Sequence, residues 1–319
     1  MAVLDGKLVA EKIQGELRLE IKRLKGEGGR VPGLAVIMVG DDPASRSYVN
    51  SKSKLAEKLG IRSELVKLAE NVAAEEVIRT IEAANADPLV HAILVQMPLP
   101  KHLDSWKILD RILPEKDVDC FHPYNQGLIL QNRASLFPCT PCGVMKILDH
   151  FGIDPAGLNA AVVGRSFLVG KPMAAMLTNR NATVTLCHSR TVNLGRILHE
   201  ADLIVAAVGK PAFITAEMVK PGVVLIDVGI NHIEKEQDFA NFCPPSQYEG
   251  FKKKGYAITG DIHFQAFAKA SHYTPVPGGV GPLTVTMLMH NTVELCKRQA
   301  AIGEGKTKAK GKSEENRAK

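Results

Sequence analysis

The sequence alternates between two kinds of hydrophobic pattern. Short continuous apolar runs, typical of buried parallel strands, are separated by longer segments whose apolar residues recur every three or four positions, as on one face of a helix. This predicts a first helix that is capped by Asp5 and ends at Gly28, then strands at residues 34–39, 63–68 and 92–95, with helices at 45–59, 74–86 and 105–112. The alternation indicates right-handed crossovers and an α/β fold.

The pattern becomes irregular between residues 114 and 142 and then resumes. We expect a domain boundary at the proline-rich segment 138–141, which precedes a predicted helix at 143–151. The second series comprises strands at 160–163, 183–187, 203–208 and 223–228, helices at 171–179, 193–199 and 264–270, and a last helix at 283–299. This half is typical of a nucleotide-binding α/β unit.

A glycine-containing turn follows the first strand of the second series. The apolar run at residues 160–163 ends at Gly164, and Gly170 lies just before a segment with helical spacing. A strand, tight turn and helix in this order leave backbone N–H groups that attract phosphate. The spacing is not G-x-G-x-x-G, so an ordinary βα turn is the alternative.

The residues after the second strand of this series indicate which dinucleotide is preferred. An acidic residue at that position would bind the adenosine ribose of NAD. Here the strand is followed by His188, Ser189 and Arg190, and Arg165 lies in the preceding turn. Basic side chains can neutralise a 2′-phosphate, so the sequence favours NADP over NAD. Exposed basic residues without a ligand are the alternative.

Composition narrows the function classes. The 319 residues are 45% hydrophobic and 23% charged, which is typical of a globular protein. No apolar run approaches the roughly 20 residues that a membrane helix needs, and the first residues are too charged for a signal peptide. We therefore expect a cytoplasmic protein without a membrane partner.

The net charge of +6 suggests a nucleic-acid partner, but this charge is not spread evenly along the chain. Residues 303–319 contain six basic and three acidic side chains, which give half of the net charge. This tail is polar and lacks aromatic residues, so we predict that it is disordered. A nucleic-acid-binding module would depend on the tail alone, and we expect no nucleic-acid partner.

Six cysteines in a chain of this length are too few for a disulfide framework. Cys139 and Cys142 have the C-x-x-C spacing of some zinc and redox sites. No second pair of this kind occurs, and the intervening Thr-Pro dipeptide suits a helix start. We therefore expect no metal.

Three positions in the first half have side chains suited to catalysis. Tyr48 and Lys52 lie four residues apart on one predicted helix and therefore share a face. Gln96 follows the strand at 92–95, at the edge of the sheet where ligands bind in open α/β folds. A solvated lysine beside an aromatic ring and a solvent-facing loop glutamine are the alternatives. Asp117 and Asp119 occur in the next connection, where aspartate is also common in ordinary turns.

The segment 275–282 contains three prolines and three glycines in eight residues and precedes the last helix. Proline restricts the backbone and glycine allows its close approach to a ligand. We interpret this segment as a shaped binding loop rather than a linker.

Seven segments together resemble the bifunctional methylenetetrahydrofolate dehydrogenase/methenyltetrahydrofolate cyclohydrolase family. They are YVNSK at 48–52, QMPLP at 96–100, KDVD at 116–119, PCTP at 138–141, GRSFLVGKPM at 164–173, DVGIN at 227–231 and PVPGGVGP at 275–282. The resemblance extends in order from about residue 3 to residue 298. It implies NADP-dependent oxidation of 5,10-methylenetetrahydrofolate, then hydrolysis of the methenyl product to 10-formyltetrahydrofolate.

The resemblance also implies roles for individual residues. Lys52 is then the central catalytic group, Gln96 orients it, Tyr48 stacks on the folate and Asp119 anchors the pterin. The other implied substrate-binding residues are Val95, Met97, Pro98, Leu99, Pro277, Gly278 and Gly279. The implied cofactor-binding residues are Gly164, Arg165, Ser166, Val169, Gly170, Pro172, His188, Ser189, Arg190, Val208, Gly209, Ile230 and Thr284.

The family architecture implies two α/β domains that flank a cleft, the second a Rossmann-type domain with a parallel sheet. The catalytic domain would comprise residues 1–140, completed by the helix 282–300, and the NADP-binding domain residues 141–275. The family also implies a homodimer and a role in purine biosynthesis. A monofunctional NAD(P)-dependent methylenetetrahydrofolate dehydrogenase is the alternative function.

The sequence departs from the family pattern in three places. Cys120 follows Asp119 where the family usually has glycine. A polar segment at 234–256, interrupted by two prolines, is expected to be a surface insertion. The lysine-rich tail is additional. No residue implied in catalysis is missing.

Overall fold

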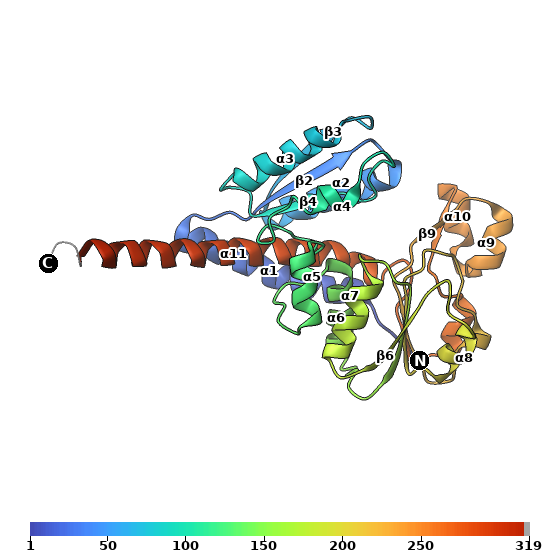
Figure 1. Cartoon of the computed structure of the whole chain (residues 1–319). Helices are drawn as coiled ribbons and strands as arrows, with labels where there is room; N and C mark the ends of the chain where they lie inside the picture. The colour runs from blue at the N-terminus through green and yellow to red at the C-terminus, as the bar shows by residue number, and fades with distance from the viewer. Residues whose placement is uncertain (316–319) are drawn as a thin grey trace. The chain divides into compact units, whose positions relative to one another are not determined.

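The computed structural model describes residues 1–315, except for the side chains of residues 43, 44, 47, 48 and 302–315. The chain forms two compact units (Figure 1). The three-stranded unit consists of residues 14–126 and 288–319, and the six-stranded unit of residues 1–13 and 127–287. The expected boundaries differ from this division, in which the first 13 residues belong with the second series of strands.

The three-stranded unit contains a parallel sheet in the order β3-β2-β4. Its strands are β2 (Gly33–Val39), β3 (Arg62–Leu68) and β4 (Ala92–Val95). Its helices include α2 (Pro43–Leu59), α3 (Ala74–Ala86) and α4 (Ser105–Leu109). Every residue of the central strand β2 is buried, as expected for a strand covered on both faces, and every residue of the edge strand β4 is buried as well.

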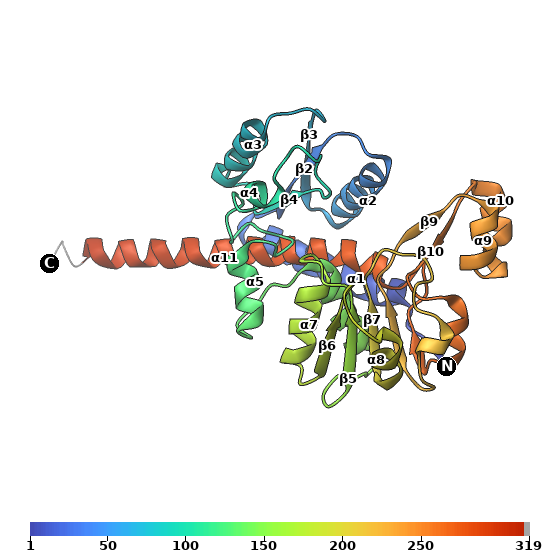
Figure 2. The same cartoon turned by 45° about the vertical axis from the view of Figure 1, so that its right-hand side comes forward.

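The six-stranded unit contains a parallel sheet in the order β1-β11-β8-β7-β5-β6 (Figure 2). Its strands are β1 (Ala2–Val3), β5 (Asn159–Val163), β6 (Thr183–Cys187), β7 (Leu203–Ala206), β8 (Val224–Asp227) and β11 (His272–Tyr273). The chain passes from β5 to β6 on one side and then to β7 on the other. The carboxyl ends of β5 and β7 therefore form a topological switch point, the usual place for a ligand in such sheets.

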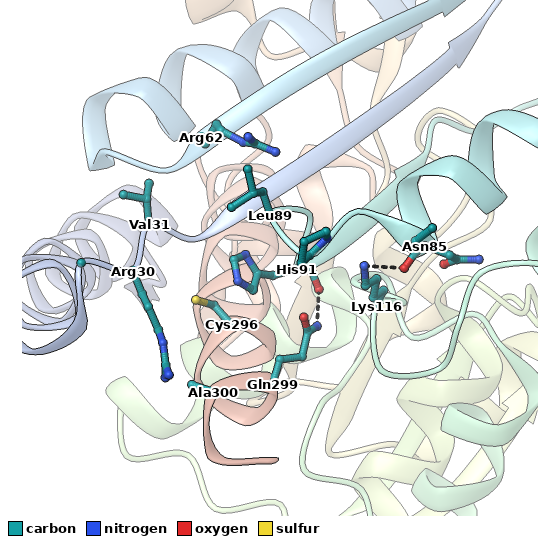
Figure 3. Close-up of a pocket in the computed structure, with 13 residues that line it drawn as sticks. Arg30, Val31, Arg62, Asn85, Leu89, His91, Lys116, Cys296, Gln299 and Ala300 are labelled. Carbon is teal, nitrogen blue, oxygen red and sulfur yellow. Dashed lines mark hydrogen bonds between the residues drawn. The ribbon is translucent and has the colours of Figure 1, made fainter. Parts of the chain in front are cut away.

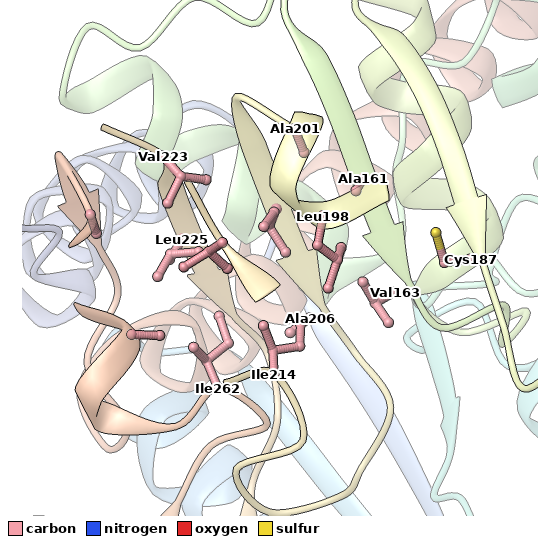
Figure 4. Close-up of a cluster of buried hydrophobic side chains, with 14 residues drawn as sticks. Ala161, Val163, Cys187, Leu198, Ala201, Ala206, Ile214, Val223, Leu225 and Ile262 are labelled. Carbon is pink, nitrogen blue, oxygen red and sulfur yellow. The ribbon is translucent and has the colours of Figure 1, made fainter. Parts of the chain in front are cut away.

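Helices α6 (Cys139–His150), α7 (Gly170–Asn179) and α8 (Leu194–Glu200) accompany this sheet. Short 3-10 helices η1 (Ala216–Met218) and η3 (Phe264–Lys269) lie near its last strands. A buried apolar cluster fills the space beside the strands (Figure 4). It includes Ala161, Val163, Cys187, Leu198, Ala206, Ile214, Leu225 and Ile262.

The predicted surface insertion has a core of its own. Strands β9 (Asn231–Ile233) and β10 (Ala257–Thr259) form an antiparallel pair that encloses α9 (Glu236–Phe242), η2 (Pro245–Gln247) and α10 (Tyr248–Lys254). Five residues are buried together: Ile233, Phe239, Cys243, Phe251 and Ala257. The segment is therefore a small folded subdomain, because its aromatic residues are numerous enough to bury one another.

Three helices contain residues of both units: α1 (Gly6–Gly28), α5 (Pro123–Leu130) and α11 (Val280–Glu315). Asp5 caps α1 as predicted, since its Oδ1 accepts a hydrogen bond from Lys7 N at 2.9 Å. Within the three-stranded unit, Asn291 and Gln299 of α11 donate to backbone carbonyls of Val118 and His91. No helix in the described part of the chain is long and apolar enough to cross a membrane.

The α/β fold class is confirmed, but some local predictions differ from the structure. Helix α5 lies in the segment that looked irregular. Helix α11 continues to Glu315, through most of the predicted disordered tail. A helix that is already formed can be extended without a new nucleation step. Residues 316–319 lie outside the described residues.

Candidate active site

Lys52 and Gln96 meet in the three-stranded unit. Helix α2 begins after Asp42, whose Oδ2 accepts a hydrogen bond from Ser45 N at 2.8 Å, and it presents the half-buried Lys52. Gln96 follows β4 directly and is only 9% exposed. Lys52 Nζ donates to Gln96 Oε1 at 2.8 Å, and Gln96 Nε2 donates to Met97 O at 2.7 Å. The amide is thus held at both ends and fixes the lysine amine without adding a charge.

The other residues expected near this pair lie at the end of β4, in the segment that follows it, and on α2. Val95 is buried at the end of β4, whereas Pro98 is exposed and Met97 and Leu99 are half-buried. The Met97–Pro98 peptide bond is cis. Tyr48 is in α2, but its side chain lies outside the described residues.

Asp117 organises the loop that carries Asp119. The Asp117 carboxylate is 2% exposed and accepts hydrogen bonds from Phe121 N, His122 N and Asn125 Nδ2, at 3.2, 2.8 and 2.8 Å. Asp119, two residues on, is half-buried. The two aspartates therefore differ in role: Asp117 is structural, and Asp119 is the candidate for ligand binding.

Cys120 adopts a left-handed backbone conformation, with φ of 56°. Few residues other than glycine adopt this conformation without cost, because Cβ approaches the following carbonyl. Gln126 Nε2 donates to Cys120 O at 2.6 Å and fixes the peptide in place. Glycine would adopt this conformation at lower cost, so Cys120 occupies a position whose backbone favours glycine.

In the six-stranded unit, the turn after β5 is crowded. Gly164 has φ of 124°, and a Cβ there would overlap Ala207 O. A Cβ on Gly170 would overlap Gly164 O. Ser166 Oγ accepts from Val169 N at 3.2 Å and from Gly170 N at 3.4 Å, which shapes the start of α7. Because neither glycine has a Cβ, the end of β5 and the start of α7 can approach each other closely.

The same turn presents groups suited to an anion. Arg165 and Ser166 are exposed, and their backbone N–H groups have no acceptor among the residues that the structure describes. Strand β6 pairs with β5, so the residues that follow the two strands lie at the same edge of the sheet. His188 is half-buried there, and Ser189 and Arg190 are exposed. Two arginines and the N–H groups of the turn that precedes α7 fit a phosphate-bearing ligand.

Two further expected cofactor segments follow β7 and β8. Val208 and Gly209 come after β7, and the exposed Ile230 comes after β8. In the sheet, β7 pairs with β5 and β8 pairs with β7, all in parallel. The turn after β5 and the segments after β7 and β8 therefore lie at the same carboxyl edge. Pro172, in the first turn of α7, is buried.

The loop 275–282 is held within the six-stranded unit. Gly6 N donates to Gly278 O at 3.1 Å, and Gly279 N donates to Pro275 O at 2.7 Å. The Val276–Pro277 peptide bond is cis, and Pro277 is exposed. Thr284 Oγ1 lies 3.0 Å from Thr140 Oγ1. Pro277–Gly279 therefore belong to a different unit from Lys52, Gln96 and Asp119.

Sequence reasoning missed two buried aspartates in the six-stranded unit. Asp227 and Asp261 are 1% and 0% exposed, and together they accept seven hydrogen bonds. Each is next to or near a glycine, in the segments DVG and GD. Asp227 also begins the DVGIN segment of the resemblance, but neither aspartate stands out as a site residue, because aspartate near glycine is common in ordinary turns.

A hollow of about 560 Å³ in the three-stranded unit contains none of the expected residues (Figure 3). Its lining includes Arg30, Arg62, His91 and Lys116. Lys116 Nζ donates to three backbone carbonyls, and burial lowers the pKa of this ammonium. Burial lowers the pKa of His91 as well. We assign this hollow no part in catalysis.

The cysteine pair supports no metal or redox site. Cys139 and Cys142 are buried in the first turn of α6, and burial raises the pKa of Cys142 to about 11. Such a thiol stays protonated near neutral pH and is a poor ligand or nucleophile. Within the described residues, no group of three or more His, Cys, Asp or Glu side chains is placed to hold a metal ion.

A parallel sheet with a crowded phosphate-type turn, together with a lysine–glutamine pair on a second α/β unit, defines the class of dinucleotide-dependent enzymes with a separate catalytic unit. Comparisons with known proteins agree. The family model for the tetrahydrofolate dehydrogenase/cyclohydrolase catalytic domain matches residues 4–119, and that for the NAD(P)-binding domain of the same family matches residues 138–300. The chain belongs to the tetrahydrofolate dehydrogenase/cyclohydrolase family.

Individual relatives are similar over nearly their whole length. The bifunctional protein FolD of a Nitratiruptor species is 47% identical over 300 residues, which are 94% of this chain and 99% of the relative. That of Moorella thermoacetica is 48% identical over 297 residues, 93% of this chain and 99% of the relative. The predicted family is thus confirmed.

Solved structures extend the similarity to the fold. The crystal structure of the FolD enzyme from Campylobacter jejuni has a TM-score of 0.85 at 43% identity and covers 94% of this chain and 99% of its own. The Trypanosoma brucei enzyme, solved with NADP cofactor and an inhibitor, has a TM-score of 0.85 at 38% identity, with coverage of 94% and 98%.

Proposed function

We propose that this chain is a bifunctional enzyme of one-carbon folate chemistry. It oxidises 5,10-methylenetetrahydrofolate to the 5,10-methenyl compound with NADP, and it hydrolyses that product to 10-formyltetrahydrofolate. The observation that carries the proposal is the 2.8 Å hydrogen bond from Lys52 Nζ to Gln96 Oε1, which lies within the segment matched by the catalytic-domain family model.

Lys52 is the proposed proton-transfer group. In the hydrolysis, water attacks the methenyl carbon and loses one proton. The hydroxyl of the resulting adduct then loses its proton to form the formyl C=O as the bond to N5 breaks and N5 gains a proton, so that one proton is released overall. General acid–base catalysis by one positioned side chain contributes roughly 10²–10⁴-fold. Gln96 orients the lysine but, being neutral, does not hold the proton on its nitrogen as a carboxylate would.

The remaining catalytic-unit residues are proposed to bind the folate. The half-buried carboxylate of Asp119 suits the pterin, because it can accept two N–H bonds from an aminopyrimidine edge. Tyr48 is proposed to stack on the substrate. We also assign substrate contacts to Val95, Met97, Pro98, Leu99, Pro277, Gly278 and Gly279.

The carboxyl edge of the six-stranded sheet fits NADP. When bound, NADP supplies the nicotinamide ring that accepts the hydride. The N–H groups of Arg165 and Ser166 are suited to the pyrophosphate, and Arg165 and Arg190 to the 2′-phosphate. The other proposed contacts are Gly164, Val169, Gly170, Pro172, His188, Ser189, Val208, Gly209, Ile230 and Thr284.

Lys52→Met tests the proposal. We expect hydrolysis of the 5,10-methenyl substrate, followed by its ultraviolet absorbance, to fall by about 10³-fold or more. NADP affinity measured by calorimetry should stay unchanged, because Lys52 is not in the six-stranded unit. Lys54→Met is the matched control on the same helix, since Lys54 is exposed. Undiminished hydrolysis in Lys52→Met would refute the assigned role, and no hydrolysis by the unmodified protein would refute the bifunctional activity.

We also propose that the enzyme is a homodimer that associates through its cofactor-binding units and acts in the cytoplasm. All six cysteines lie within the described residues, are buried and form no disulfide, which fits a reducing compartment. Sedimentation equilibrium at micromolar concentration tests the association. A single species with the mass of one chain would contradict it.

A further inference from the structure

Asp227 and Asp261 are buried carboxylates held by backbone rather than by cations. Asp227 is the last residue of β8 and Asp261 follows β10, both in the six-stranded unit, and neither forms a salt bridge in the part of the chain that the structure describes. A buried charge is tolerated only when it is well hydrogen-bonded. Their partners therefore show what the two carboxylates hold in place.

The Asp261 carboxylate accepts hydrogen bonds from the backbone that follows β7. Its Oδ2 accepts from Val208 N at 2.6 Å and Gly209 N at 2.9 Å, and its Oδ1 accepts from Lys210 N at 3.0 Å. Three successive N–H groups thus converge on one carboxylate, as in a backbone nest around an anion. Asn231 Nδ2 adds a fourth bond at 2.9 Å and ties the segment after β8 to the same group.

Asp227 in turn holds the backbone of Asp261. Its Oδ1 accepts from Asp261 N at 2.9 Å and from Gly229 N at 3.0 Å, and its Oδ2 accepts from Ile262 N at 2.8 Å. Two glycines make the close approach possible. A Cβ on Gly229 would overlap the Asp261 carboxylate, and a Cβ on Gly260 would overlap that of Asp227. We call Asp227, Gly229, Gly260 and Asp261 the aspartate clasp.

The clasp lies at the cofactor edge of the sheet. Strand β7 pairs with β5, with Ala206 opposite Val163, so the segment 208–210 lies across the switch point from the Gly164 turn. Ile214 and Ile262 belong to the same apolar cluster as Ala206, and Ile262 directly follows Asp261 (Figure 4). The carboxylates therefore connect a rigid core to the loop that is proposed to receive the cofactor.

We infer that Asp261, supported by Asp227, is a positioning residue for the dehydrogenase step. Its carboxylate fixes the backbone of residues 208–210 in the shape that receives NADP. The inference rests on the proposed function. An asparagine at position 261 can accept hydrogen bonds on only one of its two side-chain atoms, so at least one of the loop N–H groups loses its acceptor. The loop then loses its fixed shape while the Lys52–Gln96 pair is untouched.

The two reactions provide the discriminating experiment. For Asp261→Asn we expect KM for NADP to rise about tenfold or more, with hydrolysis of the 5,10-methenyl substrate within about twofold of the unmodified enzyme. Asp202→Asn is the matched control. Asp202 also accepts a backbone N–H, from Asn159 at 2.9 Å, but it lies at the amino edge of the same sheet. Its KM for NADP should not change.

Parallel loss of both activities in folded Asp261→Asn, or an unchanged KM for NADP, would overturn the positioning role. If circular dichroism shows that this variant does not fold, Asn231→Ala decides. It removes one of the four Asp261 partners, so KM for NADP should rise at least about twofold with hydrolysis intact. An unchanged KM would overturn the inference. The unmodified enzyme is assayed first, and if it lacks both activities the proposed function itself fails.

Discussion

The two units hold their candidate sites in different ways. In the three-stranded unit, two side chains from α2 and the end of β4 bond to each other, Lys52 Nζ to Gln96 Oε1. In the six-stranded unit, the loops at the carboxyl edge are held by backbone N–H groups that converge on buried carboxylates. The first arrangement fixes the position of one side chain, and the second fixes the backbone shape of a loop.

This difference follows from what each reaction step needs. Hydrolysis requires proton transfer, so a titratable side chain must be oriented. Hydride transfer requires chiefly that two rings are positioned, since the cofactor supplies the chemistry. We therefore expect side-chain changes in the three-stranded unit to affect hydrolysis, and changes in the loops of the six-stranded unit to affect NADP.

Gln96→Met gives the largest effect among the remaining tests of this contrast. The variant keeps most of the volume but removes the acceptor at 2.8 Å from Lys52 Nζ. A misplaced catalytic group costs about 10²-fold, so hydrolysis of the 5,10-methenyl substrate should fall by about 10²–10³-fold. NADP affinity, measured by calorimetry, should stay the same.

Gln299→Met is the matched control for that substitution. Gln299 is in the same unit and also holds backbone carbonyls, those of His91 and Glu115. Hydrolysis should stay within about twofold of the unmodified enzyme, since no acceptor of Lys52 is lost. A loss of NADP affinity in Gln96→Met equal to its loss of hydrolysis would break the contrast between the units.

Arg165→Ala tests the charge at the cofactor edge. Charge-assisted bonds to phosphate are strong, so KM for NADP should rise by about 10–100-fold while KM for NAD changes within about twofold. Hydrolysis should not change. Arg180→Ala is the control, because Arg180 is bonded to Asp149 at 3.0 Å, away from the carboxyl edge. Equal losses for NADP and NAD would exclude the 2′-phosphate role.

Much of the fold was predictable because strands and helices here have strong local patterns. The strand at 92–95, the strand at 183–187 and the helix at 74–86 have the predicted bounds. Strands β1 and β11 were not predictable, since each has two residues and Ala2 pairs with His272. A strand of two residues forms only because it pairs with a strand that is distant in the sequence, so no local hydrophobic pattern predicts it.

The candidate site was predictable to the same extent. Lys52 and Gln96 stood out because a helix face and a strand end define where their side chains lie. Asp261 did not, because its role depends on N–H groups of residues 208–210, about 50 positions away. The strained φ of Cys120 was also hidden, since it is set by the loop rather than by the residue type.

Asp227 should give the six-stranded unit a pH-dependent stability. Burial raises the pKa of this carboxyl to about 7, despite three backbone hydrogen bonds that lower it. In the unfolded chain an aspartate has a pKa of about 3.9. The folded state therefore retains a proton that the unfolded state releases, and stability declines by about 1 kcal/mol per pH unit between about pH 4 and pH 7.

Urea unfolding at several pH values measures this effect. The stability difference between the unmodified protein and Asp227→Asn should fall as pH rises through that window and level off above it. Asp202→Asn is the opposite case, because the hydrogen bond from Lys220 lowers the pKa of Asp202. Its contribution is present above the unfolded pKa and is lost as pH falls. A flat difference for Asp227→Asn would contradict the raised pKa.

Substitution of Cys120 should have the smallest effect of these tests, and it asks whether backbone shape also matters in the three-stranded unit. The φ of 56° at Cys120 shows that the Asp119 loop in the three-stranded unit also depends on backbone shape. In this conformation glycine is favoured over an L-residue by about 1 kcal/mol. Cys120→Gly should therefore be more stable than Cys120→Ala, by denaturant unfolding. Both variants lose the thiol, so comparing them removes its packing from the measurement.

Cys142 supplies the control, since it is also buried but has a helical backbone in the first turn of α6, where its N–H donates to Pro138 O at 2.9 Å. In a helix alanine is favoured over glycine, by up to about 1 kcal/mol, so Cys142→Ala should be the more stable of that pair. The difference in stability between the glycine variant and the alanine variant should thus have opposite signs at positions 120 and 142. The same sign at both positions would show that the loop relaxes around Cys120. The three-stranded unit would then hold its site by side chains alone.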